Sequence, residues 1–210
     1  MLEFSDVARK SGVVFVKYQQ YLSDSGECVG VVITADHSLD SSLIVKLVKA
    51  AKEGELMVVD VVSENAEHRV SHIQKYCDFE VIVPTDCKLD ANEVARRYFD
   101  SFNDAGLMAI DVNDVCNLIR AGSSNGYAFY GCGNTAAMAV QDLTQNSSFL
   151  EKLTSTKSVL LDIVMSEPTM VDAGEIATAI ENLAPNDCVI IFTARWGIEI
   201  DGLSVLAIIS

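Results

Sequence analysis

The chain has 210 residues, half of them hydrophobic and only three of them proline, so it can bury a sizeable core and long disordered stretches are not expected. Its formal net charge of −15 excludes nucleic acid and anionic membranes as expected partners, because both bind a basic face. The simplest interpretation of this charge is a solvated acidic surface that keeps the protein soluble.

Targeting and spanning signals are absent from the sequence. The opening "MLEFSDVARKSGVVFV" has neither a basic region nor a long apolar run, so a signal peptide is not expected. No apolar run approaches the roughly 20 residues that a membrane-spanning helix needs. Six cysteines occur without a C-x-x-C pair, several of them inside apolar runs, which indicates reduced, buried thiols. These features predict a cytoplasmic protein.

The first 88 residues alternate apolar runs with polar turns. Strands are predicted at "SGVVFVKYQQ", "CVGVVIT", "ELMVVDVV" and "DFEVIVPT". The polar turn "YLSDSGE" separates the first two strands. An amphipathic helix that begins near Asp40 joins the second and third, because a carboxylate at a helix start accepts hydrogen bonds from free backbone N–H groups.

A possible metal site lies in "SENAEHRVSHIQKYC", between the last two of these strands. His68 and His72 are four residues apart, and Glu64 comes one turn before His68. Two histidines at this spacing can bind zinc, but a site needs a third ligand and usually a base, as in H-E-x-x-H. No glutamate stands between them. A solvated helix face is therefore expected, and no metal site is predicted.

A helix is predicted at residues 89–105, where Val94, Tyr98, Phe99 and Phe102 recur at helical spacing and Gly106 suits the C-cap. The second half then repeats the earlier order of elements. It contains a short helix after "GLMAIDVNDV", a strand at "GYAFYGC", an alanine-rich helix, and a closing series of strand, helix, strand and strand.

The decapeptide "GLMAIDVNDV", residues 106–115, places Asp111 and Asp114 three residues apart at the start of a helix. Catalytic acids, a contact in a polymer, and a helix cap are the three interpretations. Capping is the simplest, with Asp111 or Asn113 as the N-cap and Asp114 in the first turn. The first half offers parallel acids, Glu3 and Asp6, which favour the cap because a cap should recur in both halves.

Trp196, in "ARWGIEIDG", is placed by the same pattern in the turn between the last two strands. A tryptophan that covers the edge of the sheet is favoured over an exposed one that marks an interface.

The repeated order of elements predicts a tandem duplication. Residues 1–88 form the first module, residues 89–105 a linking helix and residues 106–210 the second module, with a pseudo-two-fold axis between the modules. Each module is expected to be a roughly four-stranded mixed sheet with helices. Short turns among these strands favour an α+β fold over a doubly wound sheet.

From Phe79 to the end, the chain resembles the bacterial cell-division tubulin FtsZ, from its last GTPase-domain strand through its C-terminal domain. The strand "FEVIVPTD" is followed by a helix and by "GLMAIDVNDV", which is similar to the family's synergy loop, G-L-I-N-x-D-x-x-D-V. The strand, glycines and alanine-rich helix of "GYAFYGCGNTAAMAVQDL" come next, and "SVLLDIVM" opens the closing strands. The resemblance implies a C-terminal-type module whose Asp111 and Asp114 match the two acids of the loop.

The departures from the family are equally informative. Tubulin-like GTPases bind nucleotide through a G-G-G-T-G-[ST]-G loop, and no such run occurs here. Ala109 replaces the expected asparagine of the synergy loop. In the family, the two acids orient water on the GTP of a neighbouring subunit and catalyse nothing alone. The resemblance therefore implies two C-terminal-type modules without a GTPase domain.

Two functions follow as expectations. The first is a non-catalytic FtsZ/tubulin-like interaction or assembly protein, with Asp111 and Asp114 as its interaction loop and with a tubulin-like GTPase or a second copy as the partner. No nucleophile elbow, electropositive cysteine or cofactor motif contradicts it. The alternative is a small-molecule-binding protein or enzyme that uses the cleft between the modules, where an anionic ligand would need cationic groups. The candidate cations are Arg96, Arg97, Arg120 and Arg195.

Overall fold

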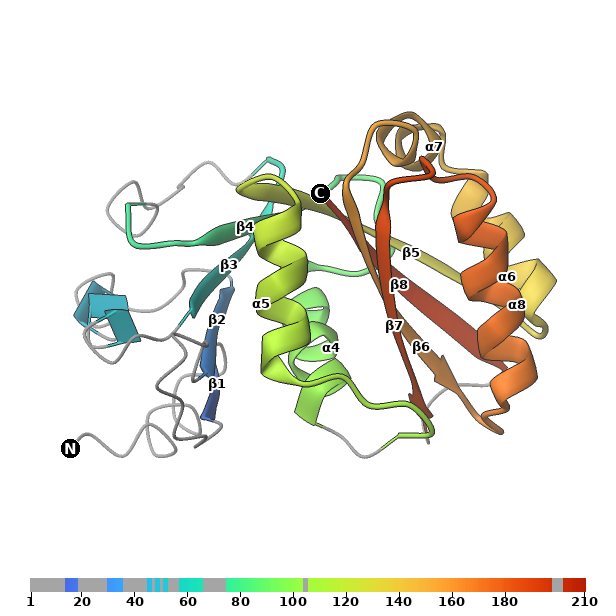
Figure 1. Ribbon diagram of the computed structural model, residues 1–210, viewed down its shortest axis with the longest axis horizontal. Coiled ribbons are helices and arrows are strands. Elements are labelled where there is room, and N and C mark those ends of the chain that lie inside the picture. Colours follow the sequence, from blue (N-terminus) through green and yellow to red (C-terminus); the bar gives the residue numbers. More distant parts are fainter. Residues whose placement is uncertain are drawn as a thin grey trace.

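The computed structural model describes residues 14–18, 30–35, 45–46, 48–49, 51–52, 57–65, 75–103, 106–197 and 202–210. Within these residues the strands form one eight-stranded sheet in the order β1-β2-β3-β4-β5-β8-β6-β7 (Figure 1). The strands are β1 (Val14–Tyr18), β2 (Gly30–Ala35), β3 (Met57–Ser63), β4 (Phe79–Val83), β5 (Asn125–Gly133), β6 (Ser158–Met165), β7 (Val189–Trp196) and β8 (Leu203–Ile209). The helices whose bounds the structure describes are α4 (Ala91–Asn103), α5 (Val112–Ala121), α6 (Ala136–Thr144), α7 (Ser147–Leu153) and α8 (Met170–Glu181), and residues 45–46, 48–49 and 51–52 are also helical.

The first half of the sheet follows the chain order. β1 pairs antiparallel with β2, and β2, β3 and β4 are parallel neighbours. Every residue of β4, and every residue of β3 except Ser63, is buried. Such continuous burial, here interrupted in polarity only by Asp60 and Glu80, is typical of parallel strands that are covered on both faces.

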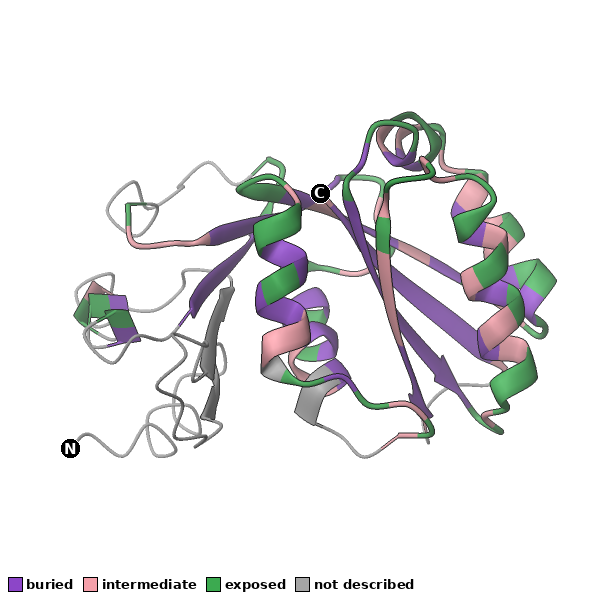
Figure 2. Ribbon diagram, viewed as in Figure 1, coloured by how far each residue is buried: buried purple, intermediate pink, exposed green. Residues whose placement is uncertain are grey.

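The second half of the sheet is mixed. β8 lies between β5 and β6 and is antiparallel to both, whereas β6 and β7 are parallel. α4 and α5 cover one face of this part, and α6 and α8 cover the other (Figure 1). β6 and β8 are consequently buried along their whole length, which explains why their sequences show no polar alternation (Figure 2).

Two hydrophobic clusters lie on the two faces of this sheet. Successive residues of β8 alternate between them: Leu206 and Ile208 join the cluster of α4 and α5, whereas Val205 and Ala207 join that of α6 and α8. The first cluster also contains residues of β3 and β4, such as Val59. α4 and α5 therefore bury side chains from both halves of the chain in one core.

The two-module arrangement is not supported. In the second half, the last strand, β8, inserts between β5 and β6, whereas in the first half β2 pairs directly with β1 and β3. The halves thus differ in strand order, and they share one sheet and the hydrophobic cluster of α4 and α5. The prediction of an α+β fold with a mixed sheet is confirmed. α4 lies within residues 89–105, where a helix was expected.

The two halves join where β4 pairs with β5. Three parallel pairs make this junction, and the last of them is Ile82 with Tyr127, which also pairs with Ile209 of β8. Gly126 lies at the centre of the junction. A Cβ there would meet the ring of Phe79 at 2.6 Å, so a residue without a side chain lets that buried ring cross the strand.

Candidate functional site

The segment at residues 106–110 lies along the free edge of β7. Met108 forms an antiparallel bridge with Ala194, through Met108 N–H to Ala194 O at 3.3 Å and Ala194 N–H to Met108 O at 3.2 Å. The hydroxyl of Thr193 donates to the same Met108 oxygen at 2.8 Å. These three bonds fix the start of the predicted interaction loop against the sheet.

Gly106 is required for this contact. A Cβ at Gly106 would lie 2.4 Å from the carbonyl oxygen of Ala194 and 3.1 Å from the Cβ of Arg195. Since the first of these atoms belongs to the backbone, it cannot rotate away. The expected role of Gly106 as a C-cap is therefore not its main one, because its lack of a side chain allows the loop to reach β7.

Asp111 and Asp114 form a reciprocal capping box at the start of α5. Asp111 Oδ1 accepts from the backbone N–H of Asp114 at 2.9 Å, and Asp114 Oδ2 accepts from the backbone N–H of Asp111 at 3.1 Å. This geometry satisfies two backbone donors at the helix start and places both charges at its positive end. The prediction of a cap is confirmed, with Asp111 rather than Asn113 as the N-cap residue.

The same two acids are available to solvent. Asp111 is exposed and Asp114 is half-buried. The capping bonds use Oδ1 of Asp111 and Oδ2 of Asp114, and among the described residues no other hydrogen bond is seen to either carboxylate. One oxygen of each carboxylate can therefore accept a hydrogen bond from another molecule while the cap stays intact.

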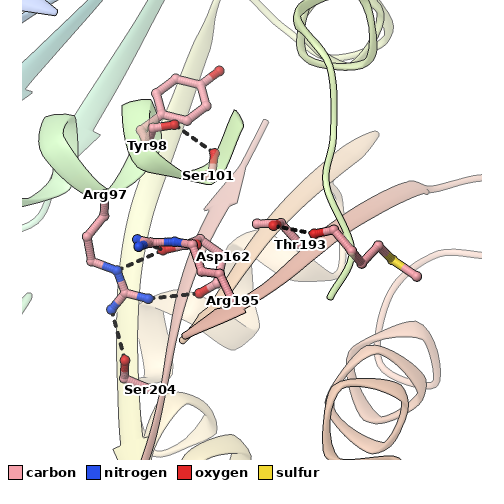
Figure 3. A network of polar contacts seen from close by, with 8 residues as sticks. Arg97, Tyr98, Ser101, Asp162, Thr193, Arg195 and Ser204 are labelled. Carbon is pink, nitrogen blue, oxygen red and sulfur yellow. Dashed lines mark hydrogen bonds and ion pairs between the residues drawn. The ribbon is translucent and has the colours of Figure 1, made fainter. Parts of the chain in front are cut away.

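A buried charge network lies behind the loop, between α4 and the sheet (Figure 3). Asp162 of β6 accepts from Arg97 Nε at 2.8 Å and from Arg195 Nε at 2.8 Å, with a second bond from Arg195 at 3.1 Å. Arg97 also donates to the backbone oxygen of Asp162 and to the hydroxyl of Ser204. Asp162 is 1% exposed and each arginine 7%, so α4, β6, β7 and β8 are held together by charges that water does not screen.

The sequence carried a signal for this network that was missed. Asp162 stands alone in the run "SVLLDIVM", all of which is buried, and a carboxylate in such a strand needs cationic partners. Arg97 and Arg195, considered above as cations for an anionic ligand, are those partners. Arg96 and Arg120 lie on the exposed side of their helices instead. The four arginines therefore do not form one binding site.

A second polar link ties the loop after β4 to α6. Lys88 Nζ lies 2.6 and 2.8 Å from the two carboxylate oxygens of Asp142, which also accepts from the backbone N–H of Cys132 at 2.9 Å. The hydrogen bond with Asp142 raises the pKa of Lys88. Burial acts to raise the pKa of Asp142, but the bonds from Lys88 and Cys132 outweigh burial and lower it.

The thiols that the structure describes form no disulfide. Cys116 is buried, Cys77, Cys87 and Cys188 are half-buried, and Cys132 is exposed, so the expectation of buried thiols fails at Cys132. Burial, together with the charges of nearby acids that include Asp60 and Glu80, raises the pKa of the Cys77 thiol. Cys77 is thus poorly suited to be a nucleophile, which needs a thiolate.

The metal hypothesis rests on His68 and His72, which lie outside the described residues, as do Glu3 and Asp6. Glu64 accepts from the backbone N–H of Thr85 at 3.2 Å and so supports the turn after β4. Within the described part of the chain, no group of three or more histidine, cysteine or acidic side chains could hold a metal ion.

Two surface features remain at the β7 edge. Trp196 is the last residue of β7 and is 55% exposed, so the expectation that it covers the sheet edge is wrong. A groove of about 400 Å³ lies between α8 and β7. It is lined by Ala177, Glu181, Pro185, Asn186, Cys188, Ile190 and Phe192. No described helix is long and apolar enough to cross a bilayer.

A mixed sheet of β5, β8, β6 and β7, with helices on both faces and a capped loop lying against β7, places the chain in the FtsZ/tubulin-like fold. An empty FtsZ dimer from M. jannaschii superposes with a TM-score of 0.65 at 18% identity, over 79% of this chain and 57% of that one. A point mutant of the same FtsZ gives the same TM-score and identity, over 79% of this chain and 60% of that one. CetZ from Methanosaeta thermophila superposes with a TM-score of 0.55 at 12% identity, over 86% of this chain and 60% of that one.

No family model and no curated protein matches the sequence. The chain spans less than two thirds of the length of each of these solved structures. The structural match nevertheless exceeds the resemblance found in the sequence. Residues 79–210 number 132, whereas 79% of 210 residues is about 166, so the match to the FtsZ structures includes residues before Phe79.

Proposed function

We propose that this chain is a non-catalytic FtsZ/tubulin-like interaction or assembly protein of the cytoplasm, and that Asp111 and Asp114 form its contact loop. The observation that carries the proposal is that both carboxylates cap α5 with one oxygen and keep the other for a partner. The bonds of Met108 to β7 hold the loop in place before binding, which reduces the entropic cost of association.

The partner is a protein, either a tubulin-like GTPase or a second copy of this chain. The M. jannaschii FtsZ structure to which the chain is similar is a dimer, which supports self-association as one form of this role. An acidic loop on a chain of net charge −15 favours a basic protein surface and opposes nucleic acid and anionic membrane.

A role in cell division, in which the chain modifies the assembly of a tubulin-like GTPase without its own GTP hydrolysis, follows from this proposal. The absence of a G-G-G-T-G-[ST]-G run supports the lack of hydrolysis, since such a loop supplies the backbone donors that hold the phosphates. The alternative of a ligand site between two modules is not favoured, because Arg97 and Arg195 are bound to Asp162.

The test replaces both acids with asparagine, which keeps the cap and removes the charge. We expect Asp111→Asn with Asp114→Asn to leave the unfolding midpoint nearly unchanged and to weaken association at least tenfold. Association is measured by sedimentation velocity, with the protein alone and with a GTP-assembled tubulin-like GTPase. The charge-matched control is Glu151→Gln with Glu175→Gln, at two exposed positions away from the loop. Equal association by both double variants contradicts the proposal.

A further inference from the structure

The edge strand β7 directs the backbone groups of every second residue away from the sheet, and those of Ile190 and Phe192 carry no partner among the described residues. Val189 N–H donates to Lys157 O and Gly197 N–H donates to Met165 O, so odd-numbered residues of β7 direct their backbone groups toward β6. Even-numbered residues point outward, and Ala194 does so where it meets Met108. The same alternation aims the N–H and C=O groups of Ile190 and Phe192 at the free edge.

Met108 shows how this edge binds a strand. Its two hydrogen bonds with Ala194 have the antiparallel pattern. The chain then leaves the edge, because Ile110 is buried in the cluster of α4 and α5 and Asp111 is the N-cap of α5. The antiparallel pairing of this segment with β7 therefore includes Ala194 and ends before it reaches Phe192, the next residue that points outward.

The groove between α8 and β7 lies next to the outward-pointing residues Ile190 and Phe192. Ile190 and Phe192 line it from the strand, while Ala177 and Glu181 line it from α8. Five of the seven residues that line it have apolar side chains, and Glu181 is the one charged residue among them. An added strand would place every second side chain in this groove, which is the mode of recognition called β-strand addition.

We propose that β7 binds an extended segment of a partner protein, antiparallel to β7, with apolar side chains at alternate positions and a lysine or arginine that pairs with Glu181. The charge of the chain favours a basic segment of another protein over a second copy of this chain. A second copy would bring its own Glu181 and its own net charge of −15, and like charges oppose that pairing. A basic segment is attracted both by Glu181 and by the negative net charge of the chain.

This interaction goes beyond the role proposed for Asp111 and Asp114, because it uses a different part of the β7 edge. Most proteins protect such an edge with lysine, proline or a bulge. The run "CVIIFTA" at residues 188–194 contains none of these residues, and Val189 is 45% exposed. The apolar edge of β7 is thus suited to pairing.

The probe is the synthetic peptide acetyl-Lys-Val-Thr-Val-Phe-Val-Lys-amide, titrated into ¹⁵N-labelled protein. We expect the amide signals of Ile190 and Phe192 to shift and to gain protection from hydrogen exchange, while Ile191, already bonded to β6, changes little. Two N-methylated peptides, each methylated at one set of alternate residues, are the matched controls. One of the two methylated peptides should bind at least tenfold more weakly than the unmodified peptide, and the other should keep its affinity. The reason is that a strand pairs with its neighbour through the amides of alternate residues. Equal loss or equal retention overturns the proposal.

Charge recognition is tested with Glu181→Gln. This variant should bind the lysine peptide several-fold more weakly and with a smaller salt dependence, yet bind a glutamine version of the peptide as the wild type does. The double variant at Asp111 and Asp114 should bind the peptide normally, which separates this inference from the proposed function. Sedimentation of the wild type without peptide completes the test. A dimer that protects the amides of Ile190 and Phe192 would assign the edge to a second copy and overturn the proposal.

Discussion

Arg97 and Asp162 lie 2.8 Å apart although 65 positions separate them in the sequence. Arg97 belongs to α4, which packs against both halves of the sheet, and Asp162 lies in the middle of β6. Arg195 binds the same carboxylate from β7. The ion pair of Arg97 with Asp162 therefore fixes the position of α4 on the mixed part of the sheet.

Asp162→Ala should lower the free energy of unfolding by about 3–5 kcal/mol, because it leaves two buried guanidinium groups without their carboxylate. Urea denaturation followed by circular dichroism measures this change. Asp187→Ala is the control, since it removes a pair with Lys157 that lies fully in solvent and should leave the midpoint unchanged. Equal effects of the two substitutions would show that the buried network does not stabilise the fold.

Asp111→Ala should destabilise the protein by about 1 kcal/mol, while Asp111→Asn should change stability by no more than a few tenths. Alanine removes the oxygen that accepts from the backbone N–H of Asp114, and asparagine keeps an equivalent oxygen. Chemical denaturation of both variants tests this difference. If both lose the same stability, the charge at the helix start matters and the hydrogen bond does not.

Gly106→Ala should detach the loop from β7, since the new Cβ would lie 2.4 Å from the oxygen that accepts from Met108. We expect a loss of about 1–3 kcal/mol and faster hydrogen exchange at Met108 and Ala194. Gly174→Ala is the matched control. Nothing lies within 4 Å of its added Cβ, and it occupies the interior of α8, so it should stabilise the protein by about 0.5–1 kcal/mol.

The pair of Lys88 and Asp142 should make a small contribution to stability that depends on pH. The folded state lowers the pKa of Asp142, so this contribution is present above the ordinary carboxyl pKa of about 4 and is lost as the pH falls through the lowered value. The folded state raises the pKa of Lys88, so the contribution is also lost as the pH rises through that raised value, above about 10.4.

Lys88→Met should therefore cost up to about 1 kcal/mol at pH 7 and progressively less below pH 4, with solvent limiting the effect because Lys88 is 52% exposed. Urea denaturation at several pH values measures the difference. Lys157→Met provides the comparison at a pair that is fully exposed. A Lys88→Met effect that is independent of pH would indicate lost packing and not lost charge.

The purified protein should neither bind GTP tightly nor hydrolyse it. A phosphate cradle needs clustered backbone donors or a basic clamp, and the sequence has no glycine-rich run that supplies the first. Titration with a fluorescent GTP analogue and magnesium measures binding. Saturable binding at micromolar concentration would contradict this prediction and the proposed function with it.

The sequence predicted local features of the fold better than the pairing of its strands. Helical spacing of Val94 and Tyr98 indicated α4, and the acids at Asp111 and Asp114 indicated the cap, because both signals depend on residues a few positions apart. The order of the strands is a non-local property. Apolar runs such as those of β2 and β8 look alike, yet β2 pairs with the strands before and after it in the chain, whereas β8 lies between β5 and β6.

The candidate site shows the same limit. Gly106 was expected to end a helix, whereas its close approach to Ala194 depends on a strand that comes 88 positions later. Arg97 was considered free for a ligand because its partner, Asp162, stands far along the chain. A single acid within an apolar strand does signal a buried partner, but it does not indicate which cation provides it.

The position of Tyr127 has a mechanical consequence. Tyr127 pairs with Ile82 on one side and with Ile209 on the other, so the parallel and antiparallel parts of the sheet share this residue. A hinge between the halves would require these backbone bonds to break and the core under α4 and α5 to open. Binding at the Asp111 loop or at β7 should therefore leave the angle between the halves unchanged, and the sheet should transmit force from β1 to β7 as one stiff body.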